Sequence, residues 1–203
     1  MTKLIYGWGI NDVYCNVYKT ETSDGKRKNV WQCPYYRDWC SLLSRVFSKK
    51  TGTTYKNVLI CDEWKLFSNF KKWVDSQPNR NWENCQIDKD FLSKENKIYS
   101  PETCVYISAK LNSFITERVN DRGLYKIGVT WHKHGKRFVA QCSNPFGKTA
   151  YEKRGYIGGF NTEIEAHVAW KEKKHKYALL LAKNESDNRV VDKLSNMYKG
   201  GDL

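Results

Sequence analysis

The chain has 203 residues, which is room for one large domain or two small ones, and its 14% aromatic content excludes a protein that is disordered throughout. Its longest apolar run, 177–182, is too short to span a bilayer and no apolar signal core follows the first residues, so we expect a soluble, cytoplasmic protein with reduced cysteines. Lys and Arg outnumber Asp and Glu by 35 to 22, and the net charge of +13 suits a polyanionic partner such as nucleic acid.

The first 120 residues predict short strands that alternate with helices rich in aromatic residues. In chain order, the expected elements are a helix opening at Cys33, a buried strand at 58–61, a helix at 62–74, a strand at 86–92, a polar loop at 93–101, a strand at 104–108 and a helix at 109–119. Large apolar side chains recur at helical spacing in the first two helices, so we expect them to form a core.

The order strand, loop, strand and helix, with Asp88 on the first strand and Asn112 on the helix, resembles the HNH (ββα-metal) endonucleases. The resemblance spans about 33–115 and implies that Asp88 and Asn112 hold one divalent cation, Mg²⁺ or Mn²⁺. It also implies that Asn96 orients the general base. In this family the cation stabilises the charge that builds on the scissile phosphate and its leaving oxygen.

Lys89 stands where the family has its histidine base. A lysine side chain is ordinarily protonated at neutral pH and then accepts no proton. Two alternatives stay open. Lys89 neutralises the transition state while a metal-bound hydroxide or Asp90 supplies the base, or catalysis has been lost and a DNA-binding fold kept.

Half of the excess positive charge falls in a short segment, 122–160, which contains eight basic residues and one acid. The segment also predicts β-strands. The expected elements are a strand at 127–133, a turn at 134–136, a strand at 137–142, a turn at 144–147, a strand at 154–158, and a helix that begins at Asn161 or Thr162 and ends near Ala182.

Successive side chains of a strand point to opposite faces, and this alternation separates an apolar face from a polar one. Val129, Trp131 and Phe138 belong to the apolar face, which we expect to pack on the helix. The opposite face carries Thr130, His132, Arg137, Gln141, Ser143, Arg154 and Tyr156, with Lys133 and His134 at the turn. Such side chains reach base edges and phosphates in a major groove; the alternative is an ordinary solvated face.

Four segments, 125–129, 135–138, 156–160 and 162–166, closely resemble the ethylene-response-factor (apetala) type of DNA-binding domain, which phage endonucleases carry at their C-termini. The resemblance covers roughly 123–182. It implies that three strands lie in the major groove with the helix behind them, and by position it implicates Thr130, His132, Gln141, Ser143, Arg154 and Tyr156. Plant members mostly have Arg where this chain has Thr and His, so their target sequence does not transfer.

The sequence therefore predicts an α+β protein: an HNH-like ββα-metal domain with flanking helices at 1–120, a three-stranded antiparallel sheet packed on one helix at 121–184, and a polar tail at 185–203. The expected function is that of a phage-type endonuclease, of the homing kind, that cuts double-stranded DNA in the infected bacterial cytoplasm and acts as a monomer. One alternative is a catalytically silent DNA-binding regulator or decoy. Another is an interaction protein with an aromatic patch made by Tyr14, Tyr18, Trp31 and Tyr35.

The seven cysteines contain no Cys-x-x-Cys pair, and Cys33, Cys61 and Cys104 are spread through three elements. Structural zinc usually requires close ligand pairs. A structural zinc site is therefore the less favoured alternative, and we expect residues such as Cys61 and Cys142 to pack as small hydrophobic side chains.

Overall fold

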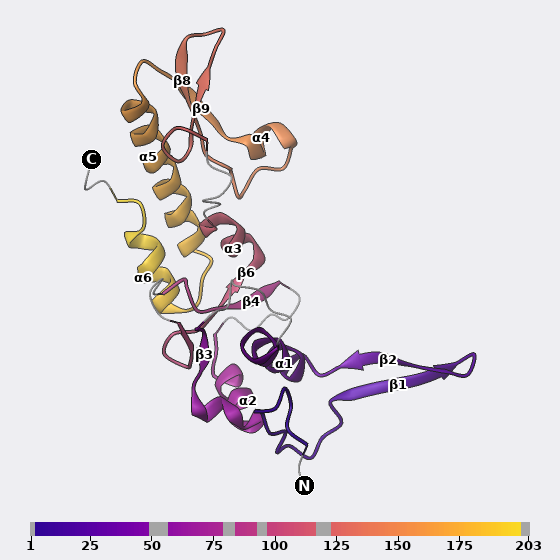
Figure 1. Cartoon of the computed structure of the whole chain (residues 1–203). Helices are drawn as coiled ribbons and strands as arrows, with labels where there is room; N and C mark the ends of the chain where they lie inside the picture. The colour runs from indigo at the N-terminus through magenta and orange to yellow at the C-terminus, as the bar shows by residue number, and fades with distance from the viewer. Residues whose placement is uncertain (1–2, 49–56, 79–83, 93–96, 117–122, 200–203) are drawn as a thin grey trace. The chain divides into compact units, whose positions relative to one another are not determined.

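The computed structural model describes residues 3–48, 57–78, 84–92, 97–116 and 123–199 (Figure 1). The chain forms two compact units, 1–107 and 108–203, so the division lies earlier than the expected boundary near residue 120. Helices and small sheets occur in both units, which confirms the mixed α+β class. None of the helices in the described ranges is long and apolar enough to cross a membrane.

Two helices and a 3₁₀ turn organise the first unit. Helix α1 (Pro34–Phe47) begins with proline at its first position, where no backbone N–H is needed. The single helix expected at 62–74 is instead a 3₁₀ helix, η2 (Asp62–Lys65), followed by α2 (Phe67–Asp75). The break occurs because Leu66 is extended and forms a β-bridge with Ile10. The Ile10 N–H donates a hydrogen bond to Lys65 O, and the Ile10 carbonyl accepts one from Phe67 N.

The core of the first unit is largely aromatic. Its fully buried members include Trp39, Trp64, Phe67, Phe70 and Tyr106. The Trp39 indole donates a hydrogen bond of 2.8 Å to the Trp64 carbonyl and thereby fixes α1 against η2. The sequence prediction that the aromatic residues of the first two helices form a core is confirmed, and Tyr106 of the strand at 105–108 joins them.

The strands of the first unit form three two-stranded sheets. Strands β1 (Tyr18–Ser23) and β2 (Lys26–Gln32) form an antiparallel hairpin. Strands β3 (Leu59–Ile60) and β5 (Ile98–Tyr99) pair in parallel, and β4 (Cys85–Asp88) pairs with β6 (Val105–Ser108). The hairpin had no counterpart among the predicted elements, and β5 lies inside the stretch 93–101 that the sequence suggested was a loop.

The second unit contains helix α3 (Ala109–Ile115) and a three-stranded antiparallel sheet in the order β7 (Val129–His132), β8 (Arg137–Gln141), β9 (Tyr156–Phe160). Helix α5 (Glu163–Ala182) packs on this sheet. The Thr162 side chain caps α5 in a reciprocal capping box with Glu165. Val129, Ala140 and Ala166 form the buried centre between sheet and helix.

Two further helices of the second unit correct the sequence prediction. Helix α4 (Ala150–Arg154) occupies a stretch to which no element was assigned, and α6 (Asn188–Asn196) lies in the expected polar tail. Val190 and Leu194 of α6 are fully buried. Asp187 caps α6, and although burial raises the pKa of its carboxyl, the hydrogen bonds from Arg189 outweigh burial and hold that pKa below its ordinary value.

Candidate functional site

The sheet β7–β8–β9 has one face on α5 and one face exposed. Phe138 and Ile157 pack beside the buried centre, on the face toward the helix. Thr130, Arg137, Gln141, Ser143 and Tyr156 are all exposed, as predicted. Val139 is an exception, because alternation places it on the same face as Arg137 and Gln141 and yet it is buried. Trp131 differs from the prediction, because 38% of it remains exposed and it lies at the rim against the Phe138 ring.

Four of the predicted DNA-binding residues line one depression of about 300 Å³. They are Thr130, Gln141, Ser143 and Arg154. Lys126 lines the same depression, and the sequence prediction missed it because it precedes the strand. Within the second unit, the depression thus combines the polar groups of these five side chains with Tyr125 and the apolar residues Ile127 and Val129.

Gly155 explains why Arg154 lies beside strand β8. The Gly155 carbonyl accepts a hydrogen bond from Cys142 N, and its left-handed backbone, φ 61°, ends helix α4. A Cβ at this position would stand 1.8 Å from the Cys142 carbonyl oxygen, so no side chain fits. Arg154 is therefore the last residue of a short helix and does not lie on the third strand, where the sequence prediction placed it.

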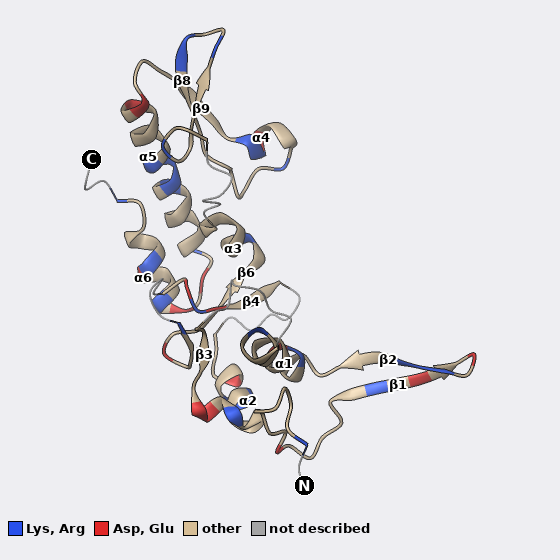
Figure 2. Ribbon diagram, in the orientation of Figure 1, with Lys and Arg blue, Asp and Glu red and all other residues tan. Residues whose placement is uncertain are grey.

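The β7–β8 turn restricts two of the predicted DNA-binding residues. The His132 Nδ1 atom accepts a hydrogen bond of 3.0 Å from Gly135 N, so one ring nitrogen serves the turn. The Arg137 side chain lies against Gly159 of β9, where a Cβ would approach its Cδ to 2.3 Å. Lys133 and His134 are exposed at the turn, where Figure 2 shows basic residues gathered.

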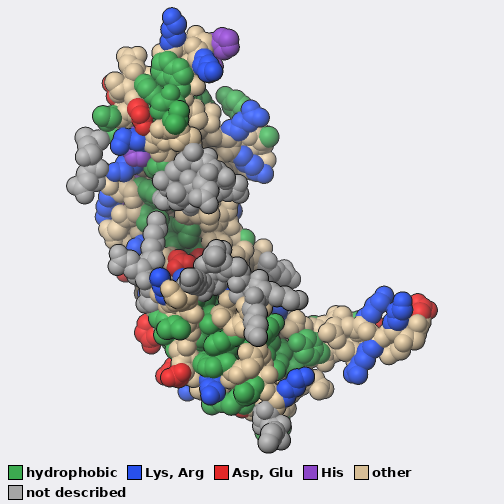
Figure 3. Space-filling view, in the orientation of Figure 1, with side chains coloured by type: hydrophobic (Ala, Val, Ile, Leu, Met, Phe, Trp, Pro, Cys, Tyr) green, Lys and Arg blue, Asp and Glu red, His purple; other side chains and the backbone are tan. Residues whose placement is uncertain are grey.

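The cations of this face form no ion pairs among the described residues, although the Glu163 carboxylate accepts a hydrogen bond from the Lys126 backbone N–H. Among the residues that the structure describes, no ion pair involves Lys126, Lys133, Arg137 or Arg154. Glu152, the one acid of the segment, is occupied by the backbone N–H groups of Lys148 and Thr149 at the start of α4. No carboxylate of the described residues therefore pairs with the side chains of these cations, and Figure 3 shows basic side chains at the top of the view.

Asp88, the first predicted metal ligand, ends strand β4. Its Oδ1 atom accepts hydrogen bonds from Asp90 N at 2.8 Å and Phe91 N at 2.6 Å, which turns the chain away from the strand. The strand expected at 86–92 therefore stops at Asp88. Burial raises the pKa of the Asp88 carboxyl above its ordinary value, although the two backbone N–H groups lower it in part.

Lys89 and Asp90 lie in the turn after Asp88. The Lys89 ammonium forms an ion pair with Asp90 Oδ1 and lies 5.8 Å from the centre of the Tyr99 ring. Only 8% of Lys89 is exposed, whereas the Asp90 side chain is largely exposed. Lys89, which stands where the HNH resemblance implies a histidine, is thus a buried, paired cation beside the predicted metal ligand.

The other two predicted residues of this site are Asn96 and Asn112. Asn96 lies outside the described residues. Asn112 is half-buried on α3 of the second unit, whereas Asp88 belongs to the first unit, so the ligand pair remains a prediction.

The cysteines show no metal centre in the described part of the chain. All seven have reduced thiols, and no group of three or more His, Cys, Asp or Glu side chains among the described residues could hold a metal ion. Cys104 is fully buried, and burial raises the pKa of its thiol to about 12, so it packs as a neutral side chain. Cys142 is buried and Cys61 is half-buried.

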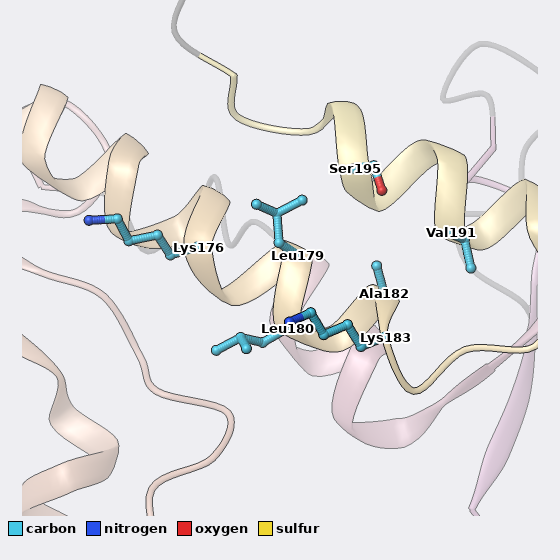
Figure 4. A pocket seen from close by; sticks show the side chains of 7 residues that line it. All are labelled: Lys176, Leu179, Leu180, Ala182, Lys183, Val191 and Ser195. Atoms are coloured by element: carbon cyan, nitrogen blue, oxygen red, sulfur yellow. The ribbon is translucent and has the colours of Figure 1, made fainter.

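A second depression, of about 580 Å³, lies between α5 and α6 (Figure 4). Leu179, Leu180, Ala182 and Val191 form its apolar lining, and Lys176, Lys183 and Ser195 complete it. It contains none of the residues that the sequence singled out. Its chemistry is that of an apolar surface with two cations.

Comparison with known proteins adds no relative. No protein-family model, no curated protein and no solved structure matches the chain.

Proposed function

We propose that the chain binds double-stranded DNA sequence-selectively through the exposed face of sheet β7–β8–β9. The observation that carries this proposal is the depression where Thr130, Gln141, Ser143 and Arg154 meet Lys126, with no carboxylate paired to its cations among the described residues. This composition suits a polyanion that also offers hydrogen-bonding edges, and double-stranded DNA has both properties.

The side chains of the depression match the groups that a major groove presents. An arginine can bond the O6 and N7 atoms of guanine, a glutamine can bond adenine, and hydroxyls serve either bases or phosphates. Three strands spaced about 4.8 Å apart give a sheet about 10 Å wide, which fits a groove about 12 Å wide. Arg154 and Gln141 would then read bases, and Lys126 and Lys133 would contact phosphates.

A divalent-cation-dependent DNA endonuclease of the homing kind is the second candidate function, with the catalytically silent DNA-binding protein as its alternative. One observation favours it: Asp88 has Oδ1 fixed by two backbone N–H groups, and no hydrogen bond from the described residues reaches its Oδ2. A carboxylate held in this way is ready to ligate Mg²⁺ or Mn²⁺. The buried Lys89 ammonium, held by the exposed Asp90 carboxylate, would then place a fixed cation near the scissile phosphate.

DNA binding is tested by titrating a labelled random-sequence duplex with the full chain at two salt concentrations. We expect binding that weakens as salt rises, because cations on phosphates release counterions. Lys133→Ala should lower the slope of log affinity against log salt by about 0.9, the value for one phosphate contact, and weaken all sequences equally.

Lys65→Ala is the matched control, since Lys65 is an exposed lysine of the first unit and no ion pair among the described residues involves it. This variant should keep the wild-type slope. A wild-type chain that fails to bind duplex DNA at low salt would contradict the proposed function.

A further inference from the structure

Hairpin β1–β2 is a two-stranded ribbon that extends beyond α1 in the first unit (Figure 1). Its base is fixed, because Cys33 N donates a hydrogen bond to Val17 O and the Tyr18 ring meets the Tyr36 ring edge-on at 5.7 Å. In the two strands, Thr20 and Gln32 are half-buried and all the other residues are exposed. The ribbon therefore contributes almost nothing to the core of the unit.

The ribbon carries more basic than acidic residues, and Glu21 lies opposite Lys28 across its two strands. Lys26, Arg27 and Lys28 follow one another at the start of β2, and none of them belongs to an ion pair among the described residues. Glu21 and Asp24 are its two acids, so the ribbon has a net positive charge (Figure 2). The Arg27 Nε atom donates to Thr20 Oγ1 at 2.9 Å, which holds the guanidinium along the ribbon.

The turn and the edges of the ribbon narrow the choice of partner. Asp24 and Gly25 both have positive φ, 54° and 71°, as a tight hairpin turn requires. Lysines on exposed strands oppose pairing with a further strand, and like charges oppose docking of a second copy. Consecutive free cations instead suit the regular phosphates of a nucleic acid.

We propose that hairpin β1–β2 is a second DNA-contacting element, in which Lys26, Arg27 and Lys28 contact phosphates of the duplex. This inference rests on the proposed function, because it requires that the chain bind double-stranded DNA. The dimensions agree: a six-residue strand spans about 20 Å, and a major groove about 12 Å wide admits a two-stranded ribbon.

The test compares the full wild-type chain with a triple variant, Lys26→Gln, Arg27→Gln and Lys28→Gln, in the titration of a random-sequence duplex. Glutamine removes the charges but keeps long polar side chains on the ribbon. Each lost phosphate contact lowers the salt slope by about 0.9, so three lower it by about 2.7 and reduce affinity at about 0.1 M salt by about 500-fold.

Two matched variants show whether a loss of DNA affinity comes from the contacts of the hairpin, from impaired folding or from the lower total charge. Lys26→Arg, Arg27→Lys and Lys28→Arg together keep the charge and should bind like the wild type. Lys3→Gln, Lys65→Gln and Lys72→Gln together remove three exposed cations of the same unit from outside the hairpin. That control should keep the wild-type slope, and circular dichroism should give one unfolding midpoint for all four chains.

The outcomes distinguish this inference from the function on which it rests. Loss of affinity and slope in the hairpin variant alone supports it. Wild-type binding with an unchanged slope in the hairpin variant, or an equal loss in the control variant, overturns it and leaves DNA binding by the sheet intact. A wild-type chain that binds no duplex overturns the proposed function itself, and this inference with it.

Discussion

A Gly128→Ala chain should lose about 2–5 kcal/mol of the unfolding free energy of its second unit, a large part of the total for a small domain. Gly128 precedes β7 with φ 80°, a conformation that costs any other residue energy. A Cβ there would stand 2.0 Å from Cδ1 of Trp170, the α5 residue that lies over it. The alanine would therefore have to displace either the strand or the indole.

Denaturant unfolding, with amide hydrogen exchange of the unit that carries the substitution as the local reporter, measures this loss. Gly25→Ala is the control, since Gly25 has a similar φ of 71° but no atom within 4 Å of its Cβ position. The control carries the backbone cost without the clash. If the two substitutions lowered the unfolding free energy equally, the clash between the new Cβ and Trp170 would add nothing to the backbone cost, and the prediction would be wrong.

Asp88→Asn should lower divalent-cation-dependent DNA cleavage by at least about 10²-fold, because the metal loses the charged ligand that holds it. Asparagine keeps a carbonyl oxygen for the N–H groups of Asp90 and Phe91, so the turn after β4 should survive. Alanine would remove both bonds and confuse loss of fold with loss of metal. The measurement is nicking and linearisation of DNA with Mg²⁺ or Mn²⁺, with a chelator as the metal-free reference.

Asp62→Asn is the control, since Asp62 is an exposed acid of the same unit and no ion pair among the described residues involves it. It should leave cleavage and duplex affinity unchanged. Cleavage at full rate by the Asp88→Asn chain would remove Asp88 from the metal site. If neither the wild type nor the Asp88→Asn chain cuts, while both bind DNA, the catalytically silent protein becomes the better account.

The second unit was predictable where patterns repeat over many residues. The β-prone residues of β7 and β8, and the capped start and length of α5, indicated the approximate bounds of these elements. Burial along the two strands does not alternate strictly, because Trp131 is exposed and Val139 is buried. Helix α4 was missed although Thr149 and Glu152 form a readable capping box, because five residues offer no periodicity. Helix α6 was missed because its buried side chains, Val190 and Leu194, lie in a polar stretch.

In the first unit, the errors arose from contacts between residues that are distant in sequence. The bridge from Ile10 to Leu66 divides η2 from α2, and the pairing of β3 with β5 makes a strand of a polar stretch. Neither contact leaves a local signal. Hairpin β1–β2 did leave one, since Asp24-Gly25 is a typical two-residue hairpin turn.

In the candidate sites too, features that follow a local sequence pattern were predictable, and features that depend on particular tertiary contacts were not. The exposed residues of β7 and β8 followed from alternation, but the joining of Arg154 to Gln141 and Ser143 depends on Gly155 and its bond to Cys142, which no local pattern predicts. Likewise, the position of Asp88 in the chain was evident from the sequence. The way its own side chain ends β4 was not.

Selection of bound duplexes from a random-sequence pool, by the full wild-type chain and by an Arg154→Ala chain, tests most directly whether the sheet of the second unit recognises DNA. The account predicts that the wild type enriches one defined sequence. It also predicts that Arg154→Ala relaxes the preference at one guanine position by about 5- to 150-fold, the equivalent of 1–3 kcal/mol for a bidentate contact. The same enriched sequence, with the same preference, from both chains would contradict the account.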